Sequence, residues 1–291
     1  MDSLLVRVKS RMFIHAHRKA LHLLDGEYAS LVTGRSMDFE DLRSYVAGDE
    51  VRDIDWKATA RSGSTLVRRY SALRRQSVVF VVDSGRSMAA AAVEGEPKSD
   101  IALLVVGVLG YLAVRHGDEV AFLGGDAERT LRQASRSSEN HLERILRSLR
   151  GSLTADAPPS DLDRVLRVLA RTVRRRAIVV VVSDDTRPDD GSRSLIRRLR
   201  AQHELVWVTV GDVDPLRPAR AIAVADGWSI PAALRHDAAL ADALSRSIDT
   251  DILALEQAFE GLGVSHRRIG RSDDVVPSLL HLLKSRHHDR G

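Results

Sequence analysis

Two segments of the chain carry carboxylate and hydroxyl side chains in a pattern that could bind a cation. The first runs from Asp83 to Ser87, and the second begins at Asp184. Ser160 lies between them in the sequence, directly before a helical stretch, and we expect it to be the N-cap of that helix. Carboxylate and hydroxyl oxygens are hard donors that suit Mg²⁺ or Mn²⁺. The pattern is compatible with a metal site where these segments meet; the alternative is that the side chains only cap helices and turns.

A parallel sheet would position these residues. From residue 77 onward, strand-like apolar runs alternate with amphipathic stretches of helical period, which is the pattern of an α/β fold with crossover helices. Strands are predicted over 77–83, 119–123, 177–183, 204–210 and 264–269, and helices over 100–116, 141–149, 161–174, 192–201, 238–262 and 275–284. Because the carboxyl ends of parallel strands meet at one edge of a sheet, the two acidic segments are expected to converge there.

The first 75 residues differ from this repeat. They begin with a helical stretch to about Leu24 and continue with a turn-rich, charge-rich segment that includes a strand over 66–70. We expect this segment to form a small sheet or flap packed on the main domain. The predicted organisation is a helix plus β-rich appendage over 1–75, an α/β domain with a mainly parallel sheet flanked by helices over 76–286, and a flexible tail over 287–291.

The composition narrows the classes of function. The chain has no cysteine, which excludes disulfides, thiolate metal ligands and a cysteine nucleophile. Its first 25 residues contain no apolar stretch of signal-peptide length, and its apolar runs are far shorter than the roughly 20 residues that span a bilayer. We therefore expect a cytoplasmic protein.

One set of arginines recurs at helical spacing and would form a stripe along the helix predicted over 161–174. Its members are Arg164, Arg167, Arg171 and Arg174. Such a stripe could bind an acidic partner or nucleic acid; the alternative is a solvated helix face in an arginine-rich chain. Nucleic acid is the least favoured ligand because the stripe contains no aromatic residue on which bases could stack.

A second charge-rich segment, in the appendage, combines arginines with aspartates around a Gly-Asp turn. The pattern favours a partly buried ion-pair network anchored by a tryptophan, with a structural role. The residues that would form it are Arg43, Gly48, Asp49, Arg52, Asp53, Asp55, Trp56 and Arg61. A catalytic alternative would make Asp53 or Asp55 a general base, but neither has an obvious nucleophile beside it in the sequence.

The acidic segments resemble the metal-ion-dependent adhesion site of von Willebrand factor type A domains. That site uses an Asp-x-Ser-x-Ser motif after the first strand, a Thr from a middle loop and a later Asp. By this resemblance Asp83 and Ser87 belong to the motif, Ser160 stands in place of the Thr, and Asp184 is the later Asp. Gly85 departs from the family, because it occupies the position of the first Ser and leaves one hydroxyl ligand missing.

The charge-rich segment resembles the signature of the domain-of-unknown-function 58 (DUF58) family. The signature reads roughly Phe-x-x-x-Arg-x-Tyr-x-x-Gly-Asp-x-x-Arg-x-Ile-Asp-Trp-x-x-x-Ala-Arg and is matched from Phe39 to Arg61. The resemblance implies a von Willebrand type A-like domain over most of the remaining chain. It also implies a MoxR-type AAA+ ATPase as partner, since such ATPases are often encoded beside members of the family.

These observations predict a non-enzymatic interaction module or adaptor. One alternative is a Mg²⁺-dependent hydrolase or phosphatase in which Asp83 and Asp184 hold the catalytic ion. The sequence has neither a Walker-type phosphate loop nor a dinucleotide-binding fingerprint. A nucleic-acid binder that uses the arginine stripe is the other alternative.

Overall fold

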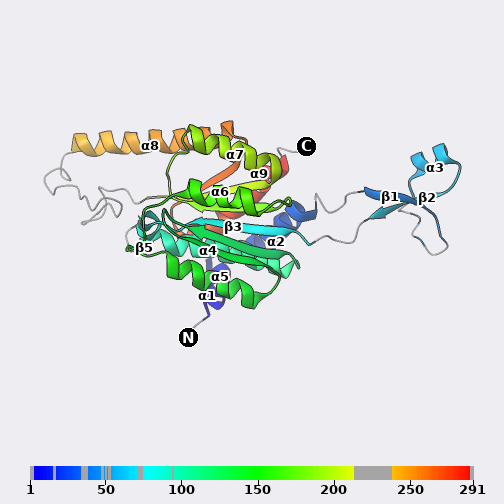
Figure 1. Cartoon of the computed structure of the whole chain (residues 1–291), viewed down its shortest axis with the longest axis horizontal. Helices are drawn as coiled ribbons and strands as arrows, with labels where there is room; N and C mark the ends of the chain where they lie inside the picture. Colours follow the sequence, from blue (N-terminus) through cyan, green and yellow to red (C-terminus); the bar gives the residue numbers. More distant parts are fainter. Residues whose placement is uncertain are drawn as a thin grey trace.

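A six-stranded, mostly parallel sheet forms the centre of the protein (Figure 1). The computed structural model describes residues 3–15, 18–33, 39–46, 49, 51, 54–70, 75–93, 95–212 and 238–288. The strand order is β10-β9-β8-β3-β6-β7, and only β7 runs antiparallel to its neighbour. The strands are β3 (Ser77–Asp83), β6 (Glu119–Gly125), β7 (Thr130–Arg136), β8 (Ile178–Ser183), β9 (Glu204–Val210) and β10 (Ser265–Ile269).

Helices cover both faces of the sheet and create two apolar cores. Successive side chains of β3 point to opposite faces, so Phe80 joins one core and Val79 and Val81 join the other. Burial on both faces explains why β3, β8 and β9 read as continuous apolar runs. The first core is covered by α1 (Leu4–His15), α2 (Arg18–Thr33), α4 (Lys98–Arg115), α5 (Glu139–Ser152) and α9 (Val275–His288); the second is covered by α6 (Leu162–Thr172), α7 (Asp190–Gln202) and α8 (Ala238–Gly261).

The N-terminal helices belong to the core of the sheet domain. Leu24 and Tyr28 of α2 are buried in the first core, and the Tyr28 hydroxyl donates to Asp118 over 2.8 Å. Glu143 of α5 accepts hydrogen bonds from the first residues of α1, including the Leu5 amide at 2.8 Å. The helical region therefore extends to Thr33, beyond its predicted end near Leu24, and a boundary at residue 75 does not separate it from the sheet.

The rest of the appendage forms a separate small unit. It consists of β1 (Phe39–Ser44) and β2 (Leu66–Tyr70), which pair antiparallel, and the short helix α3 (Trp56–Ser62). Its buried apolar side chains are Ile54, Ala58 and Val67, and none of them belongs to either core. Figure 1 shows this unit standing apart from the sheet domain, in contrast to the expected packing on it. The unit leaves four large apolar side chains exposed and does not bury them against the domain: Tyr45, Val46, Val51 and Trp56.

Strand β7 is the element that the sequence pattern does not indicate. It lies at the edge of the sheet and is mostly exposed, so polar residues and arginines replace the apolar alternation of a buried strand.

Smaller elements complete the fold: β4 (Ala91–Val93), β5 (Glu96–Pro97), and the 3₁₀ turns η2 (Arg86–Ala89) and η4 (Ser272–Asp274). Helix α9 continues through residue 288, past the predicted start of the tail, and residues 289–291 lie outside the described part. Among the described helices, none has the length and apolarity needed to cross a membrane.

Candidate functional site at the carboxyl edge of the sheet

A pocket of about 410 Å³ opens where β3 and β8 end, beside α6 and α7. It brings together three of the four residues that the sequence assigned to a metal site: Asp83, Ser160 and Asp184. The fourth, Ser87, joins them through Ser160, because their hydroxyl oxygens lie 2.7 Å apart. The convergence expected at the carboxyl edge of a parallel sheet is therefore present.

Asp83 is the most deeply buried carboxylate of this pocket, with 2% of its surface exposed. Its Oδ1 accepts a hydrogen bond of 2.9 Å from the Gly85 amide. Burial raises the pKa of Asp83 to about 7, and the negative charge of Asp184 adds to the shift. The Gly85 amide, the nearby Ser160 hydroxyl and the positive charge of Lys98 oppose it. A buried carboxyl group of this kind gains from a cation that neutralises it.

Ser160 is not the N-cap of α6, and that prediction is wrong. The cap is Asp161, whose side chain accepts a 2.9 Å hydrogen bond from the Arg164 amide. Ser160 instead ends an irregular loop that is held against the β3 loop, because the Arg86 amide donates to the Pro158 carbonyl over 3.0 Å. The Ser160 hydroxyl is thus free of capping and faces Ser87.

Gly85 is required by this loop packing. A Cβ atom added to Gly85 would overlap the Oγ, Cα and backbone N of Ser160. Gly85, which stands in place of the motif serine, therefore packs closely against the loop that carries Ser160. No side chain fits at this position unless that loop moves.

Asp184 forms the other acidic side of the pocket. Its Oδ1 accepts a 3.0 Å hydrogen bond from the Thr186 amide, and 8% of its surface is exposed. The neighbouring Asp185 serves a structural role, since it pairs with Arg268 at 2.7 Å. Of the two adjacent aspartates, only Asp184 lines the pocket.

Lys98 is a site residue that the sequence did not reveal. It begins α4, has 1% of its surface exposed, and forms an ion pair with Asp212 at the end of β9. Its charge also stabilises the ionised form of Asp83. Two further buried polar atoms beside the pocket, Ser84 Oγ and Arg86 Nε, have no hydrogen-bond partner among the described residues. The one feature of the sequence that could have drawn attention to Lys98 is that lysine is uncommon among the basic residues of this chain.

The residues of the site fit a hard divalent cation better than a soft one. No three His, Cys, Asp or Glu side chains in the described part of the chain are close enough to hold an ion by themselves. An ion at this edge would instead combine the Asp83 carboxylate with the hydroxyls of Ser87 and Ser160, and with Asp184 nearby. All of these donors are oxygens, as Mg²⁺ and Mn²⁺ prefer.

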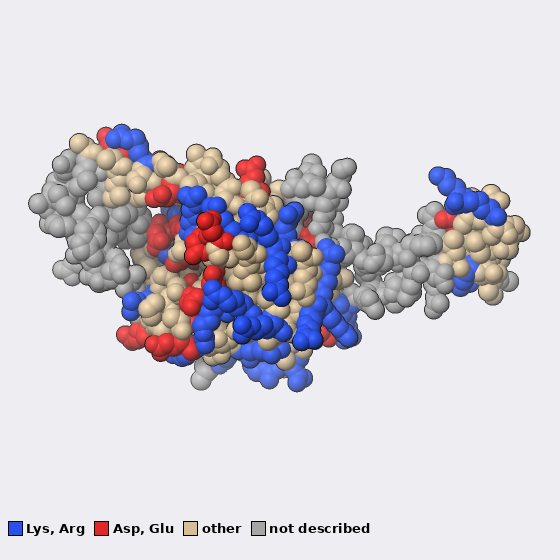
Figure 2. All heavy atoms as spheres, turned by 45° about the horizontal axis from the view of Figure 1, so that its top comes forward, with Lys and Arg blue, Asp and Glu red and all other residues tan. Residues whose placement is uncertain are grey.

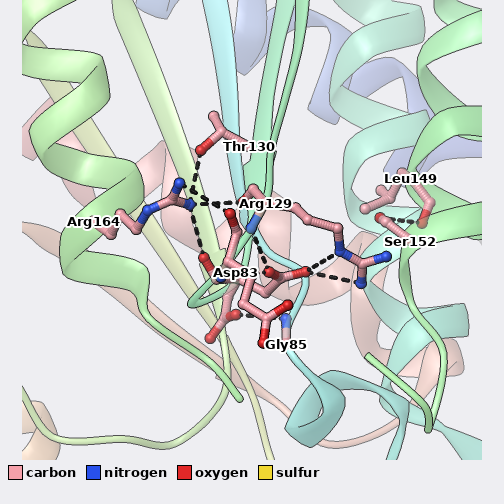
Figure 3. A network of polar contacts seen from close by, with 9 residues as sticks. Asp83, Gly85, Arg129, Thr130, Leu149, Ser152 and Arg164 are labelled. Atoms are coloured by element: carbon pink, nitrogen blue, oxygen red, sulfur yellow. Dashed lines mark hydrogen bonds and ion pairs between the residues drawn. The ribbon is translucent and has the colours of Figure 1, made fainter. Parts of the chain in front are cut away.

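The predicted arginine stripe is not a free surface, because its first member is used inside the fold. Figure 3 shows Arg164 reaching from α6 to Thr130 and the Arg129 carbonyl. The same guanidinium also donates to the carbonyls of Asp126 and Glu128. Arg164 therefore fixes α6 to the turn between β6 and β7.

Of the other stripe positions, Arg174 departs from the prediction, and Arg167 and Arg171 fit the alternative of a solvated helix face. Arg167 pairs with Asp163 at 3.3 Å, and Arg174 lies beyond the end of α6 at Thr172. Arg171 is exposed in the last turn of the helix. Figure 2 nevertheless shows basic side chains gathered over the face that carries α6 and α7, with most acidic side chains to their left.

The charge-rich segment forms local contacts, in contrast to the predicted buried network. Arg43 and Asp49 make an exposed bidentate pair with distances of 2.6 and 2.7 Å. Asp55 is the N-cap of α3 and accepts from the amides of Lys57 and Ala58. Trp56 is 64% exposed, so it is not the buried anchor that was expected, and Arg61 donates to the Lys57 carbonyl. Gly48, Arg52 and Asp53 lie outside the described residues.

Sequence comparison settles the family. Residues 41–217 match the profile described as "Protein of unknown function DUF58". The chain belongs to the DUF58 family. Relatives include the uncharacterized protein Rv1480 of Mycobacterium tuberculosis and the uncharacterized protein Mb1516 of Mycobacterium bovis. Each is 30% identical over 237 residues, which cover 77% of this chain and 74% of the relative.

Solved structures with some similarity to this DUF58 protein include two from Bacteroides. A conserved hypothetical protein BatB from Bacteroides thetaiotaomicron is 15% identical, with a TM-score of 0.44 and coverage of 73% of this chain and 99% of that one. An aerotolerance-related membrane protein from Bacteroides fragilis is 16% identical, with a TM-score of 0.43 and coverage of 72% and 99%.

Proposed function

We propose that this DUF58 protein is a non-enzymatic interaction module with a von Willebrand type A-like fold. In this proposal Asp83, Ser87, Ser160 and Asp184 hold Mg²⁺ or Mn²⁺, and a carboxylate of a partner protein completes the coordination of the ion. The observation that carries it is the buried Asp83 carboxyl group beside paired serine hydroxyls in a pocket of about 410 Å³. The proposed partner is a MoxR-type AAA+ ATPase in the cytoplasm.

The protein residues have distinct roles in this proposal. Asp83 supplies the negative charge that attracts the ion, and Ser87 and Ser160 supply neutral oxygens. Lys98 forms an ion pair with Asp212, so the Asp212 carboxylate adds little negative charge to the site. The bound ion would supply an open coordination position for the incoming carboxylate.

Binding is favoured over catalysis by the chemistry of the lining. The described residues that line the pocket include no His, Lys or Cys. The two serine hydroxyls lie within hydrogen-bonding distance of each other, and the Asp83 carboxyl group, which interacts with the Ser160 hydroxyl, would be occupied as a ligand of the proposed ion. A hydrolase would need a positioned base or an activated nucleophile in addition to the ion.

The test has two parts. The first is calorimetric titration of Mg²⁺ and Mn²⁺ into the full chain, and the second is a pull-down of a MoxR-type AAA+ ATPase that is encoded beside its gene. Asp83→Asn should abolish saturable ion binding and ATPase capture. Asp189→Asn is the matched control, because Asp189 lines the same pocket but caps α7, a role that asparagine also fills. ATPase capture that is equal with EDTA and with Mg²⁺ would refute the metal-dependent mechanism.

A further inference from the structure

A second and larger cavity lies at the opposite, amino edge of the sheet. Its volume is about 840 Å³, within the size range of small-molecule sites. It is lined by the beginnings of β9 and β10, by the end of α7 and by α8. The cavity shares no lining residue with the pocket at Asp83.

Four arginines line this cavity and have no partner among the described residues. They come from separate elements and are Arg176, Arg197, Arg200 and Arg267. No described carboxylate lies within ion-pair distance of any of them, whereas Arg268 next in sequence is paired with Asp185. All four guanidinium groups are exposed, and a small anion that entered the cavity could contact more than one of them.

The backbone at Gly263 is shaped to admit one of these guanidiniums. Gly263 has a φ of 61°, in the left-handed region that favours glycine. A Cβ atom at this position would lie 2.7 Å from Cζ of Arg200. Arg200 therefore lies directly against the turn that leads into β10.

A buried histidine supplies an independent sign of a ligand. His203 lines the cavity and has 2% of its surface exposed; the Val173 carbonyl lies near its ring, but neither ring nitrogen has a well-aligned hydrogen bond with a described residue. A neutral imidazole has one N–H donor, and leaving it unpaired in the interior is unfavourable. An oxygen atom of a ligand in the cavity could accept that hydrogen bond.

The acidic residues of the lining indicate a small ligand and not a long polyanion. Glu256 and Glu260 line the cavity together with the arginines. Their charges would repel a nucleic-acid backbone, but they accept hydrogen bonds from hydroxyl or amino groups. We infer that this cavity binds a small phosphate-bearing molecule whose phosphate lies among Arg176, Arg200 and His203, and whose hydroxyl or amino groups face the glutamates.

The experiment is calorimetric titration of the full chain with inorganic phosphate, pyrophosphate and AMP at 150 mM NaCl. Saturable binding of at least one probe is expected. Arg200→Gln should weaken it by roughly tenfold, since charge-assisted hydrogen bonds to phosphate are lost. Arg187→Gln should leave it unchanged, because Arg187 is an exposed arginine of the other pocket.

His203→Phe tests the buried donor without depending on a surface charge. It should weaken probe binding while leaving the melting temperature the same or higher, because it removes an unpaired polar group from the interior. The inference is overturned if no probe binds saturably, or if Arg187→Gln and Arg200→Gln weaken binding equally. Tighter binding of a single-stranded oligonucleotide than of AMP, lost in Arg200→Gln, would also overturn it. These results are independent of whether Asp83 binds a metal.

Discussion

The backbone of Ser160 occupies the space that a side chain on Gly85 would need. Gly85→Ser would recreate the serine of the adhesion-site motif, yet we expect it to destabilise the protein by roughly 1–3 kcal/mol, as overpacking does, without adding a ligand. Urea unfolding measures this loss. Gly151→Ser is the control, because nothing lies within 4 Å of a Cβ at Gly151. A Gly85→Ser protein of unchanged stability that binds Mg²⁺ more tightly would contradict this expectation.

Metal binding at Asp83 should depend on pH near neutrality. The pKa of Asp83 is raised to about 7, so the carboxyl group is mostly protonated at pH 6 and mostly ionised at pH 8. Since an ion must displace the proton, the affinity for Mg²⁺ should rise by about tenfold from pH 6 to pH 8. Calorimetry in buffers of different ionisation enthalpy would detect the released proton. An affinity that is flat over this range would show that Asp83 does not ligate the ion.

The same buried carboxyl group should cost stability when no ion is added. Its folded-state pKa lies above the ordinary value of 3.8 for an aspartate, so the folded protein binds this proton more tightly than the unfolded chain. Stability should therefore fall as pH rises from about 4 to about 7. The Asp83→Asn variant has no carboxyl group to ionise, so its stability should not fall in this way. At pH 8 it should be more stable than the wild type by on the order of 2 kcal/mol. Thermal unfolding in EDTA tests this, and the control Asp189→Asn should show the slope of the wild type.

The sequence predicts the central sheet well because burial on both faces leaves a strong local pattern. The runs that form β3, β8 and β9 consist almost entirely of apolar residues and are found within one residue of their predicted limits. Edge strand β7 carries arginines and polar residues, so its membership of the sheet depends on pairing with β6 and leaves no apolar signal. The DUF58 assignment rests on a local motif and is confirmed by the family profile.

The candidate site was predictable only where a residue follows a strand. Asp83 and Asp184 sit at strand ends, and their convergence follows from parallel topology. The fit of Gly85 to Ser160 joins residues far apart in sequence, so residue type at either position does not reveal it. Lys98 was missed for the same reason, because its partner Asp212 lies on another strand end.

The two kinds of arginine on α6 should differ sharply in their effect on stability. Arg164 is half-buried and donates to four oxygen atoms of the turn between β6 and β7. Arg164→Met should destabilise the protein by about 1–2 kcal/mol, since part-buried and exposed acceptors of the turn lose a charged donor. Arg171→Met, at an exposed position of the same helix, should change stability by less than about 0.5 kcal/mol. Equal effects in urea unfolding would show that the Arg164 contacts add no stability.

The exposed Trp56 should matter for partner binding and not for folding. With 64% of its surface exposed, it buries little, so Trp56→Ala should change the free energy of unfolding by less than about 0.5 kcal/mol. Exposed aromatic side chains are frequent anchors of interfaces, and losing one typically weakens binding by tenfold or more. On the proposed partnership, capture of the AAA+ ATPase should fall by about that factor in a quantitative pull-down. Leu253→Ala is the matched control, because Leu253 is 54% exposed on α8, away from the signature. If both variants capture the ATPase as the wild type does, the signature unit does not contact this partner.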